Sequence, residues 1–169
     1  MATPKNEYLN IIKNTNLISA DLIIFDEEKR VLVGKRKNNP EINKFFVPGS
    51  RVYKSEKIID AIPRICNFEL GITLKNPKLK GVYEHIYDNN FENNDFGTHY
   101  VVFAYEFSID NETKKQINNS TFNKQHSKID WMNINSLLDN DNVSFYCKNY
   151  FIKNPINHIV WLFLISEIE

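Results

Sequence analysis

Residues able to move a proton occur in apolar or strand-like surroundings. Asp21 interrupts the apolar run Leu17–Phe25. A buried carboxylate is costly unless it is paired, so we expect Asp21 to face a cleft or to meet an arginine or a sugar hydroxyl. The alternative is an aspartate on an edge strand that faces water. His126 offers an imidazole with an ordinary pKa of about 6.5, which can act as a general base. We expect His126 on a loop, and judged alone an exposed histidine without a catalytic role is the favoured interpretation.

Two further pairs have a spacing that suits a site. His85 and Tyr87 stand two apart on a presumed strand and so point to the same face. That placement suits sugar or phosphate contacts, and it suits ordinary cross-strand packing equally. Glu56 and Arg64 lie two helical turns apart, so a salt bridge could hold the helix to the preceding loop. We expect this structural role for Glu56, and Arg64 has a helper role in a site as its alternative.

The elements that must position these residues follow from hydrophobic periodicity. Strands are expected at Leu17–Phe25, 31–35, 45–47, 79–86, 99–107 and 129–132. Helices are expected at 7–13, from Ser55 as N-cap to Gly71 as the stop, at 133–138, at 145–152 and at 157–169. Pro63 falls inside the second of these helices, where it costs about 3 kcal/mol, and it predicts a kink near Ile59.

Composition narrows the class of protein. Hydrophobic residues make up 42% of the 169 residues, and Lys plus Arg equals Asp plus Glu at 21 each. This balance predicts one α/β domain over residues 1–169 and argues against a nucleic-acid partner. The start of the chain lacks an apolar signal core and the apolar run 159–165 is too short to span a bilayer, so we expect a cytoplasmic protein without a membrane partner. Cys66 and Cys147 are expected to be reduced core thiols.

One motif resembles the Nudix box of the Nudix hydrolase family. It consists of Ser50, Glu56, Arg64 and Glu69-Leu70-Gly71-Ile72. In that box, glutamates at helix positions i, i+3 and i+4 share one face and chelate hard cations bound to a diphosphate. Here Ile65 and Phe68 occupy the positions of two such glutamates, and Ser50 replaces the first glycine. Because only Glu69 remains, we expect one Mg²⁺ or Mn²⁺, completed by carbonyls, neutral side chains, water and substrate phosphates.

Further segments resemble the GDP-mannose mannosyl hydrolase branch of that family. They are 19–21 (Ser-Ala-Asp), 34–36 (Gly-Lys-Arg), 46–49 (Phe-Val-Pro-Gly), 51–52 (Arg-Val), 85–91 (His-Ile-Tyr-Asp-Asn-Asn-Phe), 98–102 (Thr-His-Tyr-Val-Val) and 125–126 (Gln-His), with Trp131 and 141–143 beyond them. The most specific are the 85–91 run and the Gln125-His126 pair. This branch is known for the same thinning of the box.

The resemblance implies a fold and a reaction. The fold would be a Nudix-type α/β/α sandwich with a mixed β-sheet, a helix in residues 1–14 and a helical extension in residues 153–169. The reaction would be hydrolysis of GDP-mannose, with GDP-glucose as a second candidate, to GDP and the free sugar. Water would attack the anomeric carbon with inversion. A homodimer is implied as well.

The resemblance also assigns roles. His126 would be the general base, with Asp21 in the catalytic group, and Arg36, Arg51 and Tyr100 would donate hydrogen bonds to the leaving diphosphate. The metal ligands would be Glu69, the Gln125 side chain and the Gly49 carbonyl. The substrate contacts would be Tyr8, Arg36, Arg51, His85, Tyr87 and Tyr100. Guanine could stack on Tyr8, which helical spacing makes equally a core residue. Arg36, taken alone, would be a surface cation.

Two other functions stay open. One is ordinary Nudix cleavage of a nucleotide sugar at phosphorus, against which the missing glutamates at Ile65 and Phe68 count. The other is a non-catalytic nucleotide-sugar sensor or binding module in a polysaccharide pathway. Turnover, set against tight metal-dependent binding, separates the enzyme from the module.

Overall fold

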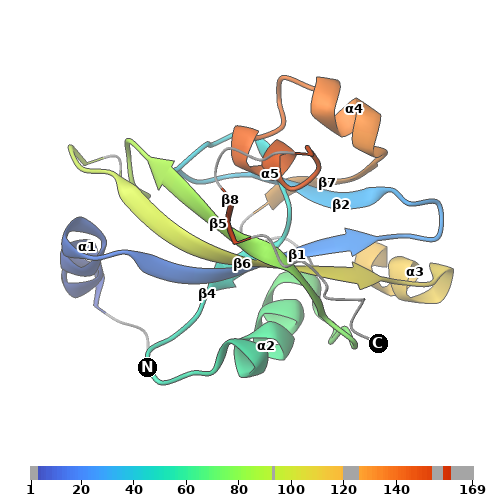
Figure 1. Ribbon diagram of the computed structural model, residues 1–169, viewed down its shortest axis with the longest axis horizontal. Coiled ribbons are helices and arrows are strands. Elements are labelled where there is room, and N and C mark those ends of the chain that lie inside the picture. The colour runs from blue at the N-terminus through green and yellow to red at the C-terminus, as the bar shows by residue number, and fades with distance from the viewer. Residues whose placement is uncertain (1–3, 93, 120–125, 154–157, 161–169) are drawn as a thin grey trace, which may run out of the picture.

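The computed structural model describes residues 4–92, 94–119, 126–153 and 158–160. Figure 1 shows a twisted sheet with α2 on one face and α4 and α5 on the other. Helix α1 lies at one end of the sheet and α3 at the opposite end. The α/β sandwich with a mixed sheet, expected from the sequence, is confirmed.

The boundaries of the elements agree with most of the expected ranges. The helices are α1 Lys5–Asn14, α2 Ile58–Leu70, α3 Asn111–Asn119, α4 Ile134–Asp139 and α5 Phe145–Asn149. The strands are β1 Leu17–Phe25, β2 Val31–Arg36, β3 Phe45–Phe46, β4 Gly49–Arg51, β5 Lys78–Tyr87, β6 Thr98–Ser108, β7 His126–Met132 and β8 His158–Val160.

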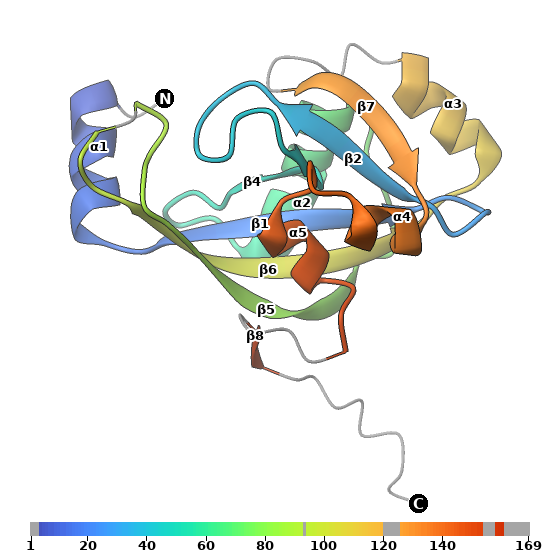
Figure 2. The ribbon, with the colours of Figure 1, turned by 90° about the horizontal axis from the view of Figure 1, so that it is seen from above.

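The sheet is built around the parallel pair β1 and β6. The strand order is β3-β2-β1-β6-β5-β8, with β4 also paired to β1 and β7 also paired to β2. Parallel strands need a long crossover, and here the crossover carries β2, β3, β4, α2 and β5, as Figure 2 shows from above. The β5–β6 hairpin is antiparallel.

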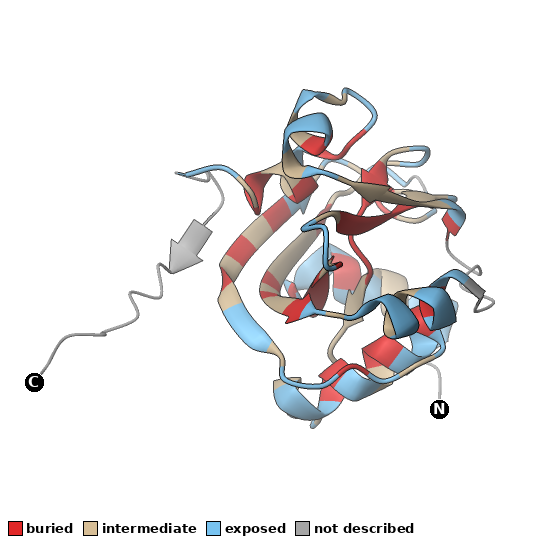
Figure 3. Ribbon diagram, turned by 90° about the vertical axis from the view of Figure 1, so that its right-hand side faces the viewer, coloured by how far each residue is buried: buried red, intermediate tan, exposed pale blue. Residues whose placement is uncertain are grey.

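Alternation along β1 divides the core into two layers. Ala20, Leu22 and Ile24 belong to the buried cluster that contains α2, whereas Ile23 belongs to the cluster on the α4–α5 side. Because successive strand residues point to opposite faces, Asp21 points to the α4–α5 side. Figure 3 shows the buried residues concentrated where the helices meet the sheet.

Helix α2 differs from the expectation at its start. The helix contains Pro63 and ends at Gly71, whose φ of 70° is the left-handed conformation that suits glycine. Ser55 is not its N-cap, because the cap position is Lys57 and no side chain caps the helix. Ser55 instead has a φ of 65° in a turn closed by the Glu56 carboxylate, which accepts a hydrogen bond from the Tyr53 backbone N–H at 2.9 Å.

The C-terminal segment is not helical where it is described. Residues His158–Val160 form β8, which pairs antiparallel with β5, so the helix expected over 157–169 and the helical extension over 153–169 are wrong for these three residues. An open edge of β5 offers unpaired backbone groups, and the β-branched Ile159 and Val160 suit a strand. Helix α5 is also shorter than expected and ends at Asn149. Residues 161–169 lie outside the described part.

Helix α3 was not anticipated from the sequence. It is polar, and its N-terminus is capped by Asp110, whose Oδ1 accepts a hydrogen bond from the Thr113 backbone N–H at 2.8 Å. The cap was a usable signal that the weak hydrophobic periodicity obscured. Across the described residues, the helices are too short or too polar to cross a membrane.

Ile65→Glu and Phe68→Glu, which restore the two missing box glutamates, should differ in stability. Ile65 is fully buried in the α2 core, whereas Phe68 is 57% exposed. Ile65→Glu should therefore lower the free energy of unfolding by about 4 kcal/mol, and Phe68→Glu by less than about 1 kcal/mol. Urea denaturation measures both. Equal effects would show that Ile65 is not held in the core.

Candidate functional site

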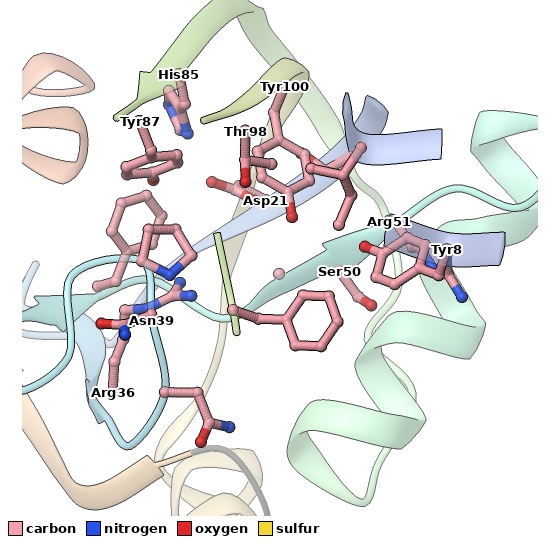
Figure 4. Close-up of a pocket in the computed structure, with 17 residues that line it drawn as sticks. Tyr8, Asp21, Arg36, Asn39, Ser50, Arg51, His85, Tyr87, Thr98 and Tyr100 are labelled. Carbon is pink, nitrogen blue, oxygen red and sulfur yellow. The ribbon is translucent and has the colours of Figure 1, made fainter. Parts of the chain in front are cut away.

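A cavity of about 330 Å³ gathers most of the residues predicted to form a site. Its lining includes Tyr8, Asp21, Arg36, Gly49, Arg51, His85, Tyr87 and Tyr100. In Figure 4, Arg36 and Asn39 lie at one end, Tyr8 and Arg51 at the other, and Asp21, Thr98 and Tyr100 between them. Residues from α1, β1, β2, β4, β5 and β6 therefore meet in one space.

Strand register explains this convergence. His85 of β5 stands opposite Tyr100 of β6, and Tyr87 stands opposite Thr98. On β1, Ser19 stands opposite Arg51 of β4. Residues two apart on a strand share a face, so each pair of strands delivers its polar side chains to the same cavity.

Gly49 is required by the closeness of Asp21. The two residues are partners in the β1–β4 pairing. A Cβ atom on residue 49 would lie 2.2 Å from Asp21 Oδ1, far inside van der Waals contact. Gly49 therefore admits the carboxylate to the cavity wall by having no side chain.

His126 lies in a small adjoining pocket. This pocket of about 50 Å³ shares Asp21, Arg36 and Gly49 with the cavity and adds His126. His126 was expected on a loop, but it begins β7, stands opposite Arg36 and is 6% exposed. Burial first, and then the charges of Arg36 and Lys37, lower its pKa from 6.5 to about 4. The imidazole is therefore neutral at physiological pH.

Gly34 makes room for His126 as Gly49 does for Asp21. A Cβ atom at residue 34 would lie 2.4 Å from Cδ2 of the His126 ring. The ring thus packs against the backbone of β2 at Gly34. Its Nδ1 atom is 3.9 Å from Glu69 Oε2. This distance is too long for a hydrogen bond, and a neutral imidazole makes no ion pair with Glu69.

The end of the cavity beside α1 is aromatic. The rings of Tyr8 and Phe91 are stacked, with centroids 5.6 Å apart and planes inclined by 25°. The Arg51 guanidinium lies 4.1 Å from the Tyr8 ring centroid. Buried Asn90 fixes the turn that carries Phe91, because its Nδ2 donates to the Phe96 carbonyl at 2.7 Å. Tyr8 is half-buried and lines the cavity.

The salt bridge between Glu56 and Arg64 is present and holds Arg51. Arg64 donates from Nε and Nη2 to the two oxygens of Glu56, both at 2.7 Å. The same Nη2 donates to the Arg51 carbonyl at 2.9 Å. Hydrogen bonding to Arg64 is the main reason that the pKa of Glu56 is lowered. These contacts connect α2 to the strand that presents Arg51.

Asp21 takes part in a buried hydrogen-bonded group. The Tyr150 hydroxyl lies 2.6 Å from Asp21 Oδ2 and 3.1 Å from His85 Nε2. Burial raises the pKa of Asp21 to about 7, although the bond from Tyr150 and the charge of Arg36 oppose the rise. Burial, and then Arg36, lower the pKa of His85 to about 3. His85 is therefore a neutral ring.

Glu69 suits a cation ligand. Burial, and then the charge of Asp21, raise its pKa to about 7, and its Oε1 has no hydrogen-bond partner among the described residues. A divalent cation would satisfy this oxygen and offset the repulsion between the carboxylates. Within the described part of the chain, no three His, Cys, Asp or Glu side chains are grouped for chelation. The fit is thus to one ion with additional neutral ligands, among which Gln125 lies outside the described residues.

The structure adds lining residues to which the sequence analysis assigned no contact with a ligand. They are Ile12, Ser19, Asn38, Asn39, Pro40, Phe46, Ser50, Phe91 and Thr98. Ser19, Phe46, Phe91 and Thr98 belong to segments that carried the resemblance, and Ser50 belongs to the box, so that signal was available. Asn38 and Asn39 precede Pro40 on the loop after β2, where only a turn could be inferred.

Asp21→Asn should change how stability depends on pH. The folded pKa of Asp21 is about 7 against an ordinary value of 3.8, so its stabilising contribution is present below the unfolded pKa and is lost as pH rises through the folded pKa. In metal-free protein, Asp21→Asn should gain about 3 kcal/mol relative to wild type between about pH 4 and about pH 8. The histidine contributions are common to both proteins and cancel.

Asp26→Asn is the matched control with the opposite sign. Asp26 is buried, but hydrogen bonds from Lys114 and Arg30 outweigh that burial and lower its pKa. Its contribution is therefore present at neutral pH and is lost on acidification. Urea denaturation across this pH range measures both variants. Parallel pH profiles for the two would contradict a raised pKa at Asp21.

Known proteins resemble the chain in sequence and in fold. It is 34% identical over 126 residues to the low-salt glycan biosynthesis protein Agl8 of Haloferax volcanii. The aligned segment covers 75% of this chain and 76% of that protein. The MutT NUDIX hydrolase from Burkholderia pseudomallei superimposes with a TM-score of 0.64 at 22% identity, covering 81% of this chain and 96% of the other. The MutT protein from Methanosarcina mazei Go1 gives a TM-score of 0.63 at 17% identity, covering 80% and 90%.

The superpositions establish the fold, and the sequence match establishes the family. Residues 15–148 match the family model described as NUDIX domain. This segment contains β1, α2 and the strands that line the cavity, with the box helix in its expected place. The chain therefore belongs to the Nudix hydrolase family.

Proposed function

We propose that this Nudix hydrolase converts GDP-mannose, or GDP-glucose as a second substrate, to GDP and the free sugar. Water would attack the anomeric carbon with inversion, in the presence of Mg²⁺ or Mn²⁺. The observation that carries the proposal is the single cavity, which has an aromatic pair at one end, two arginines along it and buried Asp21 and His85 on its wall. These three groups of side chains suit a base, a diphosphate and a sugar, respectively.

The aromatic end suits a nucleobase. The Tyr8 and Phe91 rings are both at the cavity wall, and aromatic faces stack on purines. Arg51 lies over Tyr8 and also lines the cavity, so it can contact both the base and the adjoining phosphate. This arrangement supports Tyr8 as a substrate contact and not only a packing residue.

Arg36, Arg51 and Tyr100 on the cavity wall suit a diphosphate. Arg36 has a buried Nε with no hydrogen-bond partner among the described residues, so a donor is available for an anion. Burial, followed by the neighbouring Tyr8, raises the pKa of Tyr100, which keeps its hydroxyl protonated as a donor. Arg36, Arg51 and Tyr100 could then stabilise the negative charge of GDP as it departs.

A divalent ion would be held by Glu69, the Gly49 carbonyl and the Gln125 side chain. Nudix enzymes typically use divalent metals. When bound, the ion would neutralise charge on the diphosphate. The unpartnered Oε1 of Glu69 and the raised pKa values of Glu69 and Asp21 support this assignment.

His126 would remove the proton from the attacking water. Its lowered pKa keeps the ring neutral at physiological pH, as a base requires. It adjoins the cavity through the small pocket that also contains Asp21 and Arg36. Asp21 and His85 would contact the sugar, whose anomeric carbon develops positive charge in the transition state.

The absence of two box glutamates from α2 favours attack at the anomeric carbon over attack at phosphorus. Cleavage at phosphorus by a full Nudix box uses several clustered glutamates, whereas here Ile65 is enclosed in the core and Phe68 is exposed. The similarity to a protein named for glycan biosynthesis supports a nucleotide-sugar substrate and a role in polysaccharide assembly.

The proposal includes a homodimer, which light scattering coupled to size exclusion would test.

Hydrolysis of GDP-mannose with Mg²⁺ in ¹⁸O-labelled water should place the label in free mannose and leave GDP unlabelled. Mass spectrometry of every product measures this outcome, and chelation of the metal should abolish it. Label in GMP or mannose 1-phosphate would show attack at phosphorus and exclude the proposed reaction. Metal-dependent binding without turnover would favour the nucleotide-sugar binding module.

His126→Gln should lower kcat for GDP-mannose by about 10²- to 10⁴-fold, with KM changed little, because the substitution removes the base but no substrate contact. His99→Gln is the matched control. His99 contacts Glu84 at 3.1 Å and does not line the cavity, so kcat should stay within about twofold of wild type. A His126 variant with unchanged kcat would remove His126 from the mechanism.

A further inference from the structure

We propose that Tyr150 is a positioning residue, whose hydroxyl fixes the orientation of the Asp21 carboxylate and selects the tautomer of His85. The effect of Tyr150 on the sugar rests on the proposed function, whereas the hydrogen bonds among Asp21, Tyr150 and His85 do not. Tyr150 follows α5 and lies outside the segment 15–148 that matches the NUDIX domain. Its contribution to the site therefore comes from sequence that the family match does not include.

The geometry determines the direction of each hydrogen bond. Tyr150 has one hydroxyl hydrogen, and the Asp21 carboxyl group only accepts once it is ionised, above its pKa of about 7. At 2.6 Å from Asp21 Oδ2, the hydroxyl therefore donates to Asp21. Its oxygen, 3.1 Å from His85 Nε2, must then accept from that nitrogen. The chain thus places the His85 proton on Nε2 and leaves Nδ1 as an acceptor.

All three groups are held in place by packing. Asp21, His85 and Tyr150 are 6%, 3% and 1% exposed, so water cannot replace the hydroxyl. The centroid of the Tyr83 ring lies 4.8 Å from that of Tyr150, and the centroid of the Tyr146 ring lies 4.6 Å from that of His85. The Tyr146 hydroxyl also bonds to the backbone of Ile86, which ties the α5 segment to β5 beside His85.

The two oxygens of the Asp21 carboxylate therefore have different surroundings, one bonded to Tyr150 and the other facing the cavity. Oδ2 is engaged by Tyr150, and Oδ1 lies beside Gly49 on the wall of the cavity. Free rotation of the carboxyl group would lose this orientation. Since geometric errors in a catalytic group reduce turnover more than they reduce substrate binding, the role should appear in kcat.

The test is ¹⁵N NMR of histidine-labelled full-length protein at about pH 8.5, where Asp21 is ionised, combined with kinetics. In wild type, the His85 signals, assigned by their loss in His85→Gln, should show the Nε2–H tautomer. In Tyr150→Phe, the His85 Nε2 signal should shift, kcat for GDP-mannose should fall by about 10- to 100-fold and KM should stay within about threefold. Tyr105→Phe removes a hydroxyl on the α2 side of the sheet and should leave both measurements at wild-type values.

Several outcomes would overturn the inference. An Nδ1–H tautomer of His85 in the wild type would do so without any variant, even if Tyr150→Phe failed to fold. Unchanged His85 signals or an unchanged kcat in a folded Tyr150→Phe would also do so. If the wild type binds GDP-mannose without hydrolysing it, the proposed function fails separately, and the His85 Nε2 signals of wild type and Tyr150→Phe then decide the inference without kinetics.

Discussion

A carboxyl group buried in the central strand is the constraint on which the site depends. Asp21 lies between fully buried Ala20 and Leu22 of β1, where an isolated carboxylate would be costly. The structure offsets this cost with the Tyr150 hydroxyl and the charge of Arg36, and it requires Gly49 on the neighbouring strand. Segments far apart in the sequence are thus fixed together because each must accommodate one carboxylate.

In α2, a box position that lacks its metal-binding glutamate contributes to the hydrophobic core instead. Ile65 completes the apolar layer under β1, whereas a glutamate there would bring a charge into contact with buried side chains. Glu69 alone keeps its carboxylate near His126 and close enough to Asp21 to be repelled by it. The Glu56–Arg64 bridge meanwhile keeps the structural part of the motif and connects it to Arg51.

Short segments of sequence predicted the strands whose formation depends mainly on neighbouring residues. Apolar and β-rich runs predicted β1, β5 and β6 nearly to the residue, and the register of β5 and β6 brings His85 and Tyr100 to one cavity. The burial of His126 depends on Gly34 and on the pairing of β2 with β7, which no window of sequence contains. The β8 strand likewise forms because β5 has an open edge, so its apolar segment was mistaken for a helix.

The distance along the chain between Asp21 and Tyr150 has a consequence for synthesis. Every strand that lines the cavity precedes Tyr150, so a growing chain can pair these strands before the residue that anchors Asp21 has left the ribosome. Until then the carboxylate lacks its hydroxyl partner, and contacts of such long sequence separation form slowly. Assembly of a competent site is thereby delayed until nearly the whole described domain has been made.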